Sequence, residues 1–208
     1  MGHEAGRKLR LVEDLVAVLE HNGIGTVLVG SERCCGMPKL ELGDLESIEK
    51  LKDANIDELD TYARDGYRLT AVVPSCVLMF KQELPLLFPE DERVQRVAKA
   101  FCDPFDYLMR RHRAGALKTE FSGTLGKVSY QVPCHLRVQN IGLKTRDVLQ
   151  LVPGTEVQAI ERCSGHDGTY GVKKAYHQMA MKIGKPVVKA MATMKDGSKP
   201  DHISSDCP

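Results

Sequence analysis

The chain of 208 residues lacks an excess of charge of either sign, because 29 basic side chains are nearly balanced by 28 acidic ones. This balance argues against bulk-charge binding of nucleic acid or acidic lipid. No run of about 18 apolar residues is present, which excludes a membrane-spanning helix, and the charged N-terminus lacks the apolar core of a signal peptide. No Ser-His-Asp or paired-carboxylate arrangement stands out. We therefore expect a cytoplasmic chain, with a peripheral position at the inner membrane face as the alternative.

What the chain does contain is seven cysteines, two of them in a motif that recurs. In a cytosolic chain, such a number indicates metal or redox chemistry rather than structural disulfides. The motif Glu32-Arg33-Cys34-Cys35-Gly36 reappears 129 residues later as Glu161-Arg162-Cys163-Ser164-Gly165. The spacing to the next cysteine also repeats, since Cys76 follows Cys34 by 42 residues and Cys207 follows Cys163 by 44. The sequence is therefore a duplicated cysteine-bearing unit.

The duplication implies two sites, of which the first lacks a member. Cys134 precedes Cys163 by 29 residues, and the equivalent position in the first half falls near residues 1–5, which contain no cysteine. Cys102 has no counterpart in the repeat, so we expect it to be a buried core thiol.

Apolar periodicity predicts alternating strands and helices, and hence an α/β fold built as a duplicated module of two pseudo-symmetry-related halves. Strands are expected at 26–29, 69–73, 127–132, 156–160 and 202–205, and helices at 11–22, 44–65 (with Asp44 as N-cap), 78–113, 136–151 and 172–194, the last broken by Gly184 and Pro186. The halves are predicted to span 1–118 and 119–208, with a flexible boundary at 114–126. Every cysteine except Cys102 would then follow a strand, and ligands of open α/β sheets bind at the carboxyl ends of strands.

Thiolates in this arrangement suit soft metal centres. They favour iron–sulfur clusters, zinc or copper(I), and a cluster usually takes four of them. Gly36 and Gly165 can adopt positive φ and let the backbone approach a cluster closely. Zinc held by three cysteines and one histidine is an alternative, for which His135 and His166 are the histidines nearest to a cysteine motif. Simple burial of unreactive thiols, and a His135 that only hydrogen-bonds backbone, remain the competing interpretations.

Four motifs in order resemble those of the cysteine-rich CCG domains. They are Glu32-Arg33-Cys34-Cys35-Gly36-Met37-Pro38, Pro74-Ser75-Cys76, Val132-Pro133-Cys134-His135-Leu136 and Glu161-Arg162-Cys163-Ser164-Gly165-His166-Asp167-Gly168-Thr169-Tyr170-Gly171. Such domains occur in heterodisulfide reductase, in the iron–sulfur subunits of glycolate and lactate oxidases, and in anaerobic glycerol-3-phosphate dehydrogenase. The resemblance implies iron–sulfur clusters of [4Fe-4S] type, cubane or noncubane, that pass electrons from a flavin-bearing partner to a quinone or to a thiol or disulfide acceptor.

Carried over by motif, the resemblance assigns two ligand sets. Cys34, Cys35 and Cys76 match the first set, and Cys134, Cys163 and Cys207 match the second. The sequence departs from the family pattern in several ways. Ser164 replaces a cysteine, Met79 stands where some relatives place the last cysteine of a CxxC, no ferredoxin-like CxxCxxC run is present, and Pro208 follows Cys207 directly. The missing leading cysteine of the first set, and the end of the chain directly after Cys207, predict a chain truncated at both ends.

Each set thus keeps three matched thiols, which Ser164, His135, His166 or an exogenous ligand would complete. The leading hypothesis is an iron–sulfur electron-transfer subunit or fragment. Its expected partner is a flavin-containing dehydrogenase or reductase subunit near a membrane-associated quinone site, and no nucleic-acid partner is expected. The alternative is a cluster-free or zinc-binding assembly module of the same fold.

One helix carries features that neither hypothesis uses. Lys173, Lys174, Lys182 and Lys185 predict a basic helix face that is either solvated or a docking surface. Met179, Met181, Met191 and Met194 are expected to serve core or interface packing.

Overall fold

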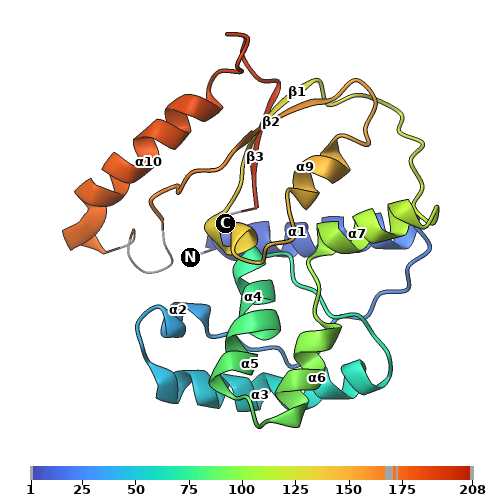
Figure 1. Cartoon of the computed structure of the whole chain (residues 1–208), viewed down its shortest axis with the longest axis vertical. Coiled ribbons are helices and arrows are strands. Elements are labelled where there is room, and N and C mark those ends of the chain that lie inside the picture. Colours follow the sequence, from blue (N-terminus) through green and yellow to red (C-terminus); the bar gives the residue numbers. More distant parts are fainter. Residues whose placement is uncertain (1, 167–170, 172, 207–208) are drawn as a thin grey trace.

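The computed structural model describes residues 2–166, 171 and 173–206, and Figure 1 shows their arrangement. The first half is helical in its described residues: α1 (Gly2–His21), α2 (Met37–Leu40), α3 (Leu45–Arg64), α4 (Pro74–Leu78), the π-helical η1 (Met79–Glu83), α5 (Leu84–Leu87), α6 (Glu92–Ala100) and α7 (Pro104–Arg113). The second half contains β1 (Lys127–Gln131), α8 (Cys134–Arg137), α9 (Lys144–Leu149), β2 (Glu156–Ile160), the 3₁₀ turn η2 (Lys174–Tyr176), α10 (His177–Met191) and β3 (His202–Ser205).

The described strands form one parallel sheet in the order β2-β1-β3. Val128 of β1 lies opposite Val157 on one side and His202 on the other. β1 is the central strand, and it is buried along most of its length. The predicted strands at 127–132, 156–160 and 202–205 are confirmed, and parallel pairing places their carboxyl ends at one edge.

Helices α2 to α6, in the lower part of Figure 1, enclose a separate hydrophobic core. Ile56 of α3, Met79 of η1 and Val97 of α6 are all fully buried in this core. The predicted helix at 44–65 is confirmed as α3, and the carboxylate of Asp44 accepts a hydrogen bond from the Ser47 N–H as its N-cap. Helices within 78–113 are confirmed as well.

Two strands predicted for the first half are absent from the described residues. Residues 26–29 form neither a helix nor a strand, and the Leu28 side chain is 66% exposed. Around Leu69 a single parallel bridge to Phe101 forms, after which Pro74 begins α4. A strand needs a neighbouring strand to hydrogen-bond its backbone groups. The surrounding segments of this half fold as helices, so these apolar runs have no described neighbour with which to form a sheet. The prediction that Cys34, Cys35 and Cys76 follow strands is therefore wrong.

The predicted break in the helix at 172–194 is also wrong, because α10 continues through Gly184 and Pro186. A Cβ atom built on Gly184 would lie 2.4 Å from the Ser164 carbonyl oxygen, so this glycine permits a close backbone approach. Pro186 has no N–H, so one backbone carbonyl of the preceding turn lacks its helical donor. Because Pro186 is exposed, that carbonyl can hydrogen-bond to water instead.

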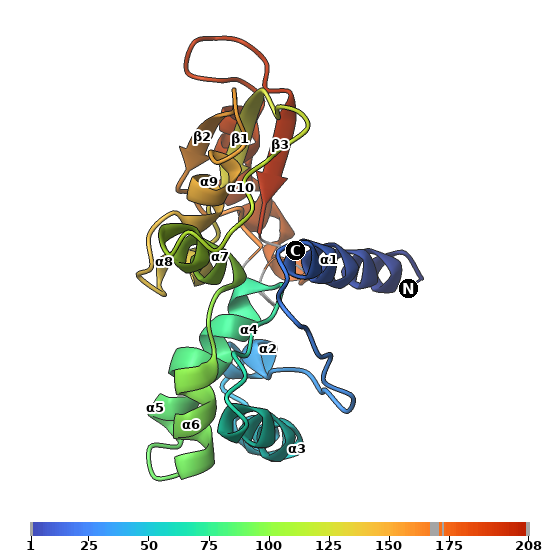
Figure 2. The same ribbon diagram turned by 90° about the vertical axis from the view of Figure 1, so that its right-hand side faces the viewer.

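Contacts between α4 and α8 join the two halves, while α1 projects sideways from the body in Figure 2. The Gln139 amide is buried and donates hydrogen bonds to the carbonyls of Pro74 and His135. Between α7 and β1, residues 114–126 form neither a helix nor a strand.

A buried carboxyl group begins α7 at the junction of the two halves. Asp103 is 2% exposed and accepts hydrogen bonds from the N–H groups of Phe105 and Asp106, at 2.9 and 3.0 Å. Burial first, and the charge of Asp206 second, raise the pKa of Asp103 from its ordinary 3.8 to about 6, against the opposing effect of these hydrogen bonds. Ionising Asp103 therefore costs the folded state free energy.

We expect the Asp103→Asn variant to flatten the dependence of stability on pH. Because the folded-state pKa is raised, the contribution of Asp103 is fully present below about pH 4 and is lost as the pH rises through about 6, by on the order of 3 kcal/mol. Asparagine keeps the helix cap without the ionisation. Urea unfolding from about pH 4 to 7.5 measures this. Asp44→Asn, at a half-buried cap, should retain the wild-type loss. An unchanged slope in Asp103→Asn would contradict the assignment.

Candidate metal centre

The second cysteine set is placed by the ends of the parallel strands. Cys134 is the first residue of α8, directly after β1 and Pro133, and Cys163 follows the end of β2 by three residues. Cys207 lies outside the described residues; the strand before it, β3, pairs with β1 on the other side. Because β1, β2 and β3 are parallel neighbours, the segments that carry Cys134 and Cys163 leave the sheet at the same edge.

A buried glutamine ties the three strand ends together. Gln131, the last residue of β1, is 2% exposed. Its amide N–H donates to the Arg162 carbonyl oxygen at 2.8 Å, and its side-chain oxygen accepts from the Ser205 hydroxyl at 2.6 Å. One side chain therefore fixes the residue before Cys163 and the end of β3 relative to β1. The sequence did not single out Gln131, although a polar residue within a buried strand was a usable signal.

The loop after Cys163 lies directly on the backbone of α10. The Gly165 N–H donates a hydrogen bond to the Cys163 sulfur at 3.3 Å. Gly165 has φ of +81°, and a Cβ atom there would lie 2.2 Å from the Ala180 carbonyl oxygen. Both the conformation and the contact require glycine. Gly165 thus adopts the positive φ that the sequence analysis expected of it, two residues after Cys163.

The first cysteine set lies on helices and a loop. Cys34 is exposed in the loop before α2, Cys35 is buried, and Cys76 is the third residue of α4. A hydrogen bond between the Cys35 and Cys76 side chains, together with burial, raises the pKa of the Cys35 thiol. Gly36, with φ of +93°, then begins α2. The structure therefore brings Cys35 and Cys76 together without the strand ends that the sequence predicted.

Asn55 of α3 fixes the loop that carries this first set. Its side-chain oxygen accepts from the Arg33 N–H at 2.8 Å, and its amide group donates to the carbonyl oxygens of Cys34 and Leu51. Asn55 is 6% exposed, so these bonds satisfy a buried amide. The sequence analysis missed this residue, because nothing local separates it from the other polar residues of the helix.

Met79 packs beside the loop that carries Cys35, within the hydrophobic core. It is fully buried, and its terminal methyl carbon lies 3.5 Å from the position of a Cβ atom built on Gly36. The Met79 thioether thus packs against the loop of Cys35 in the hydrophobic core.

Three side chains were expected to complete a site, and the structure gives some of their neighbours. The His135 imidazole lies 3.6 Å from a Glu41 carboxylate oxygen and so links α8 to the end of α2. His166 is exposed, and its carbonyl oxygen accepts a hydrogen bond from the Gly171 N–H. The Ser164 residue is exposed, while its backbone carbonyl meets α10. The imidazole of His135 thus has a carboxylate neighbour on the first half of the chain.

The donor chemistry of both sets fits a soft metal centre, because all six proposed ligands are thiols. A backbone N–H already donates to the Cys163 sulfur, which is the kind of hydrogen bond that tunes a cluster thiolate. Within residues 2–166, 171 and 173–206, no group of three or more Cys, His, Asp or Glu side chains is arranged to hold a metal ion. The second set includes Cys207, outside these residues.

Cys102 behaves as the sequence predicted for a core thiol. It is 8% exposed, and its sulfur donates to the Leu69 carbonyl oxygen at 3.6 Å. Burial raises the pKa of the thiol, which keeps it protonated and unreactive. It is therefore a matched control for the proposed ligands.

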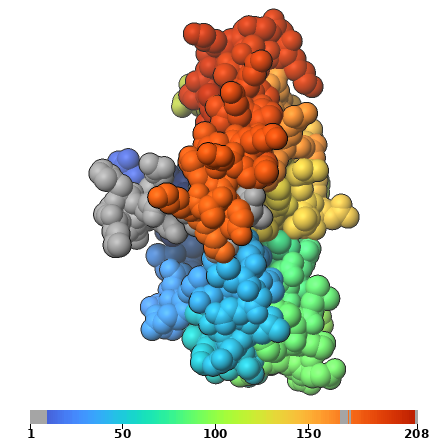
Figure 3. Space-filling view, turned by 90° about the vertical axis from the view of Figure 1, so that its left-hand side faces the viewer, coloured from blue at the N-terminus to red at the C-terminus, as the bar shows by residue number. Residues whose placement is uncertain are grey.

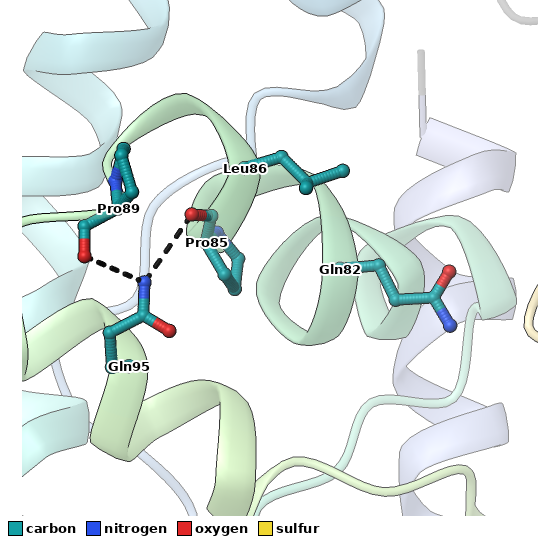
Figure 4. Close-up of a pocket in the computed structure, with 5 residues that line it drawn as sticks. All are labelled: Gln82, Pro85, Leu86, Pro89 and Gln95. Carbon is teal, nitrogen blue, oxygen red and sulfur yellow. Dashed lines mark hydrogen bonds between the residues drawn. The ribbon is translucent and has the colours of Figure 1, made fainter.

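A surface depression beside α5 and α6 offers no competing site. Its lining residues, drawn in Figure 4, are Gln82, Pro85, Leu86, Pro89 and Gln95. The Gln95 amide is directed to the carbonyl oxygens of Pro85 and Pro89, and it donates to each at 3.3 Å. The lining of this depression lacks a titratable or nucleophilic side chain.

Comparison with known families decides what this cysteine arrangement is. The cysteine-rich CCG domain matches residues 3–81 and, a second time, residues 128–208. The chain belongs to the CCG cysteine-rich domain family. Its two copies coincide with the two cysteine sets, so the predicted duplication and the α/β class are confirmed, although the described sheet lies in the second copy alone.

Relatives of this CCG chain carry names from redox metabolism. It is 27% identical over 206 residues to one of the subunits of anaerobic glycerol-3-phosphate dehydrogenase from Escherichia coli, covering 95% of the chain and 49% of that protein. It is 26% identical to one of the subunits of fumarate reductase (CoM/CoB) from Methanothermobacter marburgensis, covering 82% and 32%. Lactate utilization protein A of Oceanobacillus iheyensis is 24% identical, covering 90% and 75%.

The CCG chain spans about half the length of the glycerol-3-phosphate dehydrogenase subunits that it matches. No solved structure matches it. Among the helices of the described residues, none combines the length and the apolar character needed to cross a bilayer.

Gly165 gives a direct test of the loop geometry. We expect Gly165→Ala to destabilise the protein by at least about 2 kcal/mol more than Gly197→Ala, because of the contact with Ala180. Gly197 has a similar φ of +85° but nothing within 4 Å of its built Cβ, so both variants share the backbone strain and differ only in the contact. Urea unfolding of the two variants measures the difference, and equal losses of stability would contradict the packing described.

Proposed function

We propose that this CCG chain is an iron–sulfur electron-transfer module of a dehydrogenase or reductase complex. Cys134, Cys163 and Cys207 would hold a cluster of [4Fe-4S] type at the strand ends, and Cys34, Cys35 and Cys76 form the second candidate set. Such a cluster supplies one-electron transfer at a potential set by its surroundings. The chain's own residues hold the ligands in place, exclude water from Cys35 and donate hydrogen bonds to sulfur.

The observation that carries the proposal is the placement of Cys134 and Cys163 after adjacent parallel strands of a CCG domain. This edge is where open α/β sheets bind ligands. The Gly165 N–H on the Cys163 sulfur and the Gln131 amide on the neighbouring backbone add a preorganised frame. Simple packing of inert thiols needs neither feature, as Cys102 illustrates.

Names of relatives support the redox assignment. An uncharacterized iron–sulfur protein of Methanocaldococcus jannaschii is 26% identical over 94% of the chain. Others are called subunits of a dehydrogenase and of a reductase. We propose a flavin-containing dehydrogenase or reductase subunit as the electron donor, and a quinone or a thiol/disulfide couple as the acceptor, with the module in the cytoplasm or at the inner membrane face.

A cluster-free or zinc-binding module is the second candidate. It draws on the first set, where Met79 occupies a position that some relatives fill with cysteine and where Cys35 lies buried against Cys76. Three cysteines with one histidine would suit zinc. His135, however, lies against Glu41.

Cysteine substitutions separate these functions. In protein prepared without oxygen, we expect Cys134→Ala and Cys163→Ala each to remove about half or more of the iron, the acid-labile sulfide and the brown visible absorption, because each removes a cluster ligand. Cys102→Ala should retain all three signals, since its thiol is bonded to the Leu69 carbonyl.

Metal and sulfide analysis of the three variants measures this outcome. Equal signals in all of them would contradict the ligand assignment. Zinc without sulfide in the wild-type protein would favour the second candidate. The first set is tested in the same way with Cys76→Ala.

A further inference from the structure

The helix beside the Cys163 loop carries an uncompensated cluster of positive charge. Between Lys173 and Lys195 the chain has six lysines and no aspartate or glutamate. Since the whole chain has a net charge of +1, all other residues together carry a net charge of −5. The next acidic residue, Asp196, is already paired with Lys127. The overall charge balance therefore conceals a basic segment.

α10 is anchored to the sheet by one side only. Gly184 and Val187 are buried on that side. The Gln158 amide of β2 donates to the carbonyl oxygens of Ala190 and Thr193, and its side-chain oxygen accepts from the Lys195 N–H at 2.6 Å. These bonds fix the C-terminal end of α10 on β2. The side of α10 opposite to Gly184 and Val187 therefore faces away from the sheet.

That opposite side is a basic stripe. Lys182, Lys185 and Lys189 are exposed and follow one another at helical spacing, so they share one face. Figure 3 shows α10 in orange at the surface of this side of the molecule. Exposed apolar side chains flank the stripe, with Met181 at 59% and Val188 at 69% exposure. Exposed apolar side chains beside a stripe of one charge offer a partner protein both an apolar contact and an electrostatic one.

The basic stripe lies next to the candidate centre. The Gly165 backbone, two residues after Cys163, contacts the backbone of α10 at Ala180 and Gly184. A protein docked on the outer side of α10 would thus be separated from the Cys163 loop by little more than the helix itself.

Resting on the proposed function, we propose that the outer face of α10 is the docking surface for an acidic electron-carrier protein that exchanges electrons with the chain. Opposite charge steers such a partner to this face and orients it, while Met181 and Val188 supply the apolar contact. An anionic membrane is the less suitable occupant. A helix that lies in a bilayer turns one continuous apolar face to the lipid, whereas in α10 Gly184 and Val187 are buried against the chain and the exposed apolar side chains are divided between the two sides of the lysine stripe.

A charge-reversal experiment tests this surface. The test variant is Lys182→Glu, Lys185→Glu, Lys189→Glu, and the matched control is Lys50→Glu, Lys99→Glu, Lys118→Glu, at exposed positions of the first half. Both carry the same net charge. Binding of an acidic flavodoxin is measured by titration calorimetry at low and high ionic strength, with a basic cytochrome c and phosphatidylglycerol vesicles as comparison probes.

We expect wild type and control to bind flavodoxin with affinities within about threefold of each other, and the test variant to bind at least about tenfold more weakly at low salt, with the difference shrinking at high salt. No binding by wild type, equal losses in both variants, or lysine-dependent binding to vesicles but not to flavodoxin would each overturn the proposal. Because binding is measured whether or not iron is present, metal analysis of the same samples separates a failure of docking from a failure of the electron-transfer assignment.

Discussion

The structure depends on β1 having a parallel neighbour on each side. As the central strand it is buried along most of its length, and its last residue, Gln131, uses both ends of a buried amide to hold the backbone beyond β2 and the side chain that ends β3. An amide in this position is stable only while both neighbours are in register, because an unpaired buried polar group is costly. The segments bearing Cys134 and Cys163 inherit their positions from this arrangement.

The two CCG copies have diverged in how they hold their cysteines. In the second copy, strands and a glycine contact with α10 place Cys134 and Cys163. In the first, helices and a loop carry the set, and Cys35 lies in the hydrophobic core with Met79 while Cys34 is exposed. The two sets therefore differ in environment: Cys35 is a buried thiol beside apolar groups, which resists ionisation, whereas Cys163 is partly exposed and its sulfur accepts an N–H bond.

Sequence reasoning captured what depends on local pattern. The strand at 127–132, the N-cap at Asp44 and the repeat around Cys163 each depend on a few adjacent residues, and the structure confirms the elements that they predict. It failed where tertiary partners decide: residues 26–29 have strand-like composition but no ladder, and Gly184 is a packing position rather than a helix break. Asn55 and Gln139 act over long sequence separations that no local signal reveals.

The most direct test of the account is the iron and acid-labile sulfide content, with an EPR spectrum, of the wild-type protein purified and kept without oxygen. The account predicts iron and sulfide in equal amounts, about four of each per occupied site, and a signal from a reduced cluster. Zinc in the protein, or neither metal nor sulfide even after reconstitution with iron and sulfide, would contradict the account. The thiols of this CCG fold would then serve another purpose.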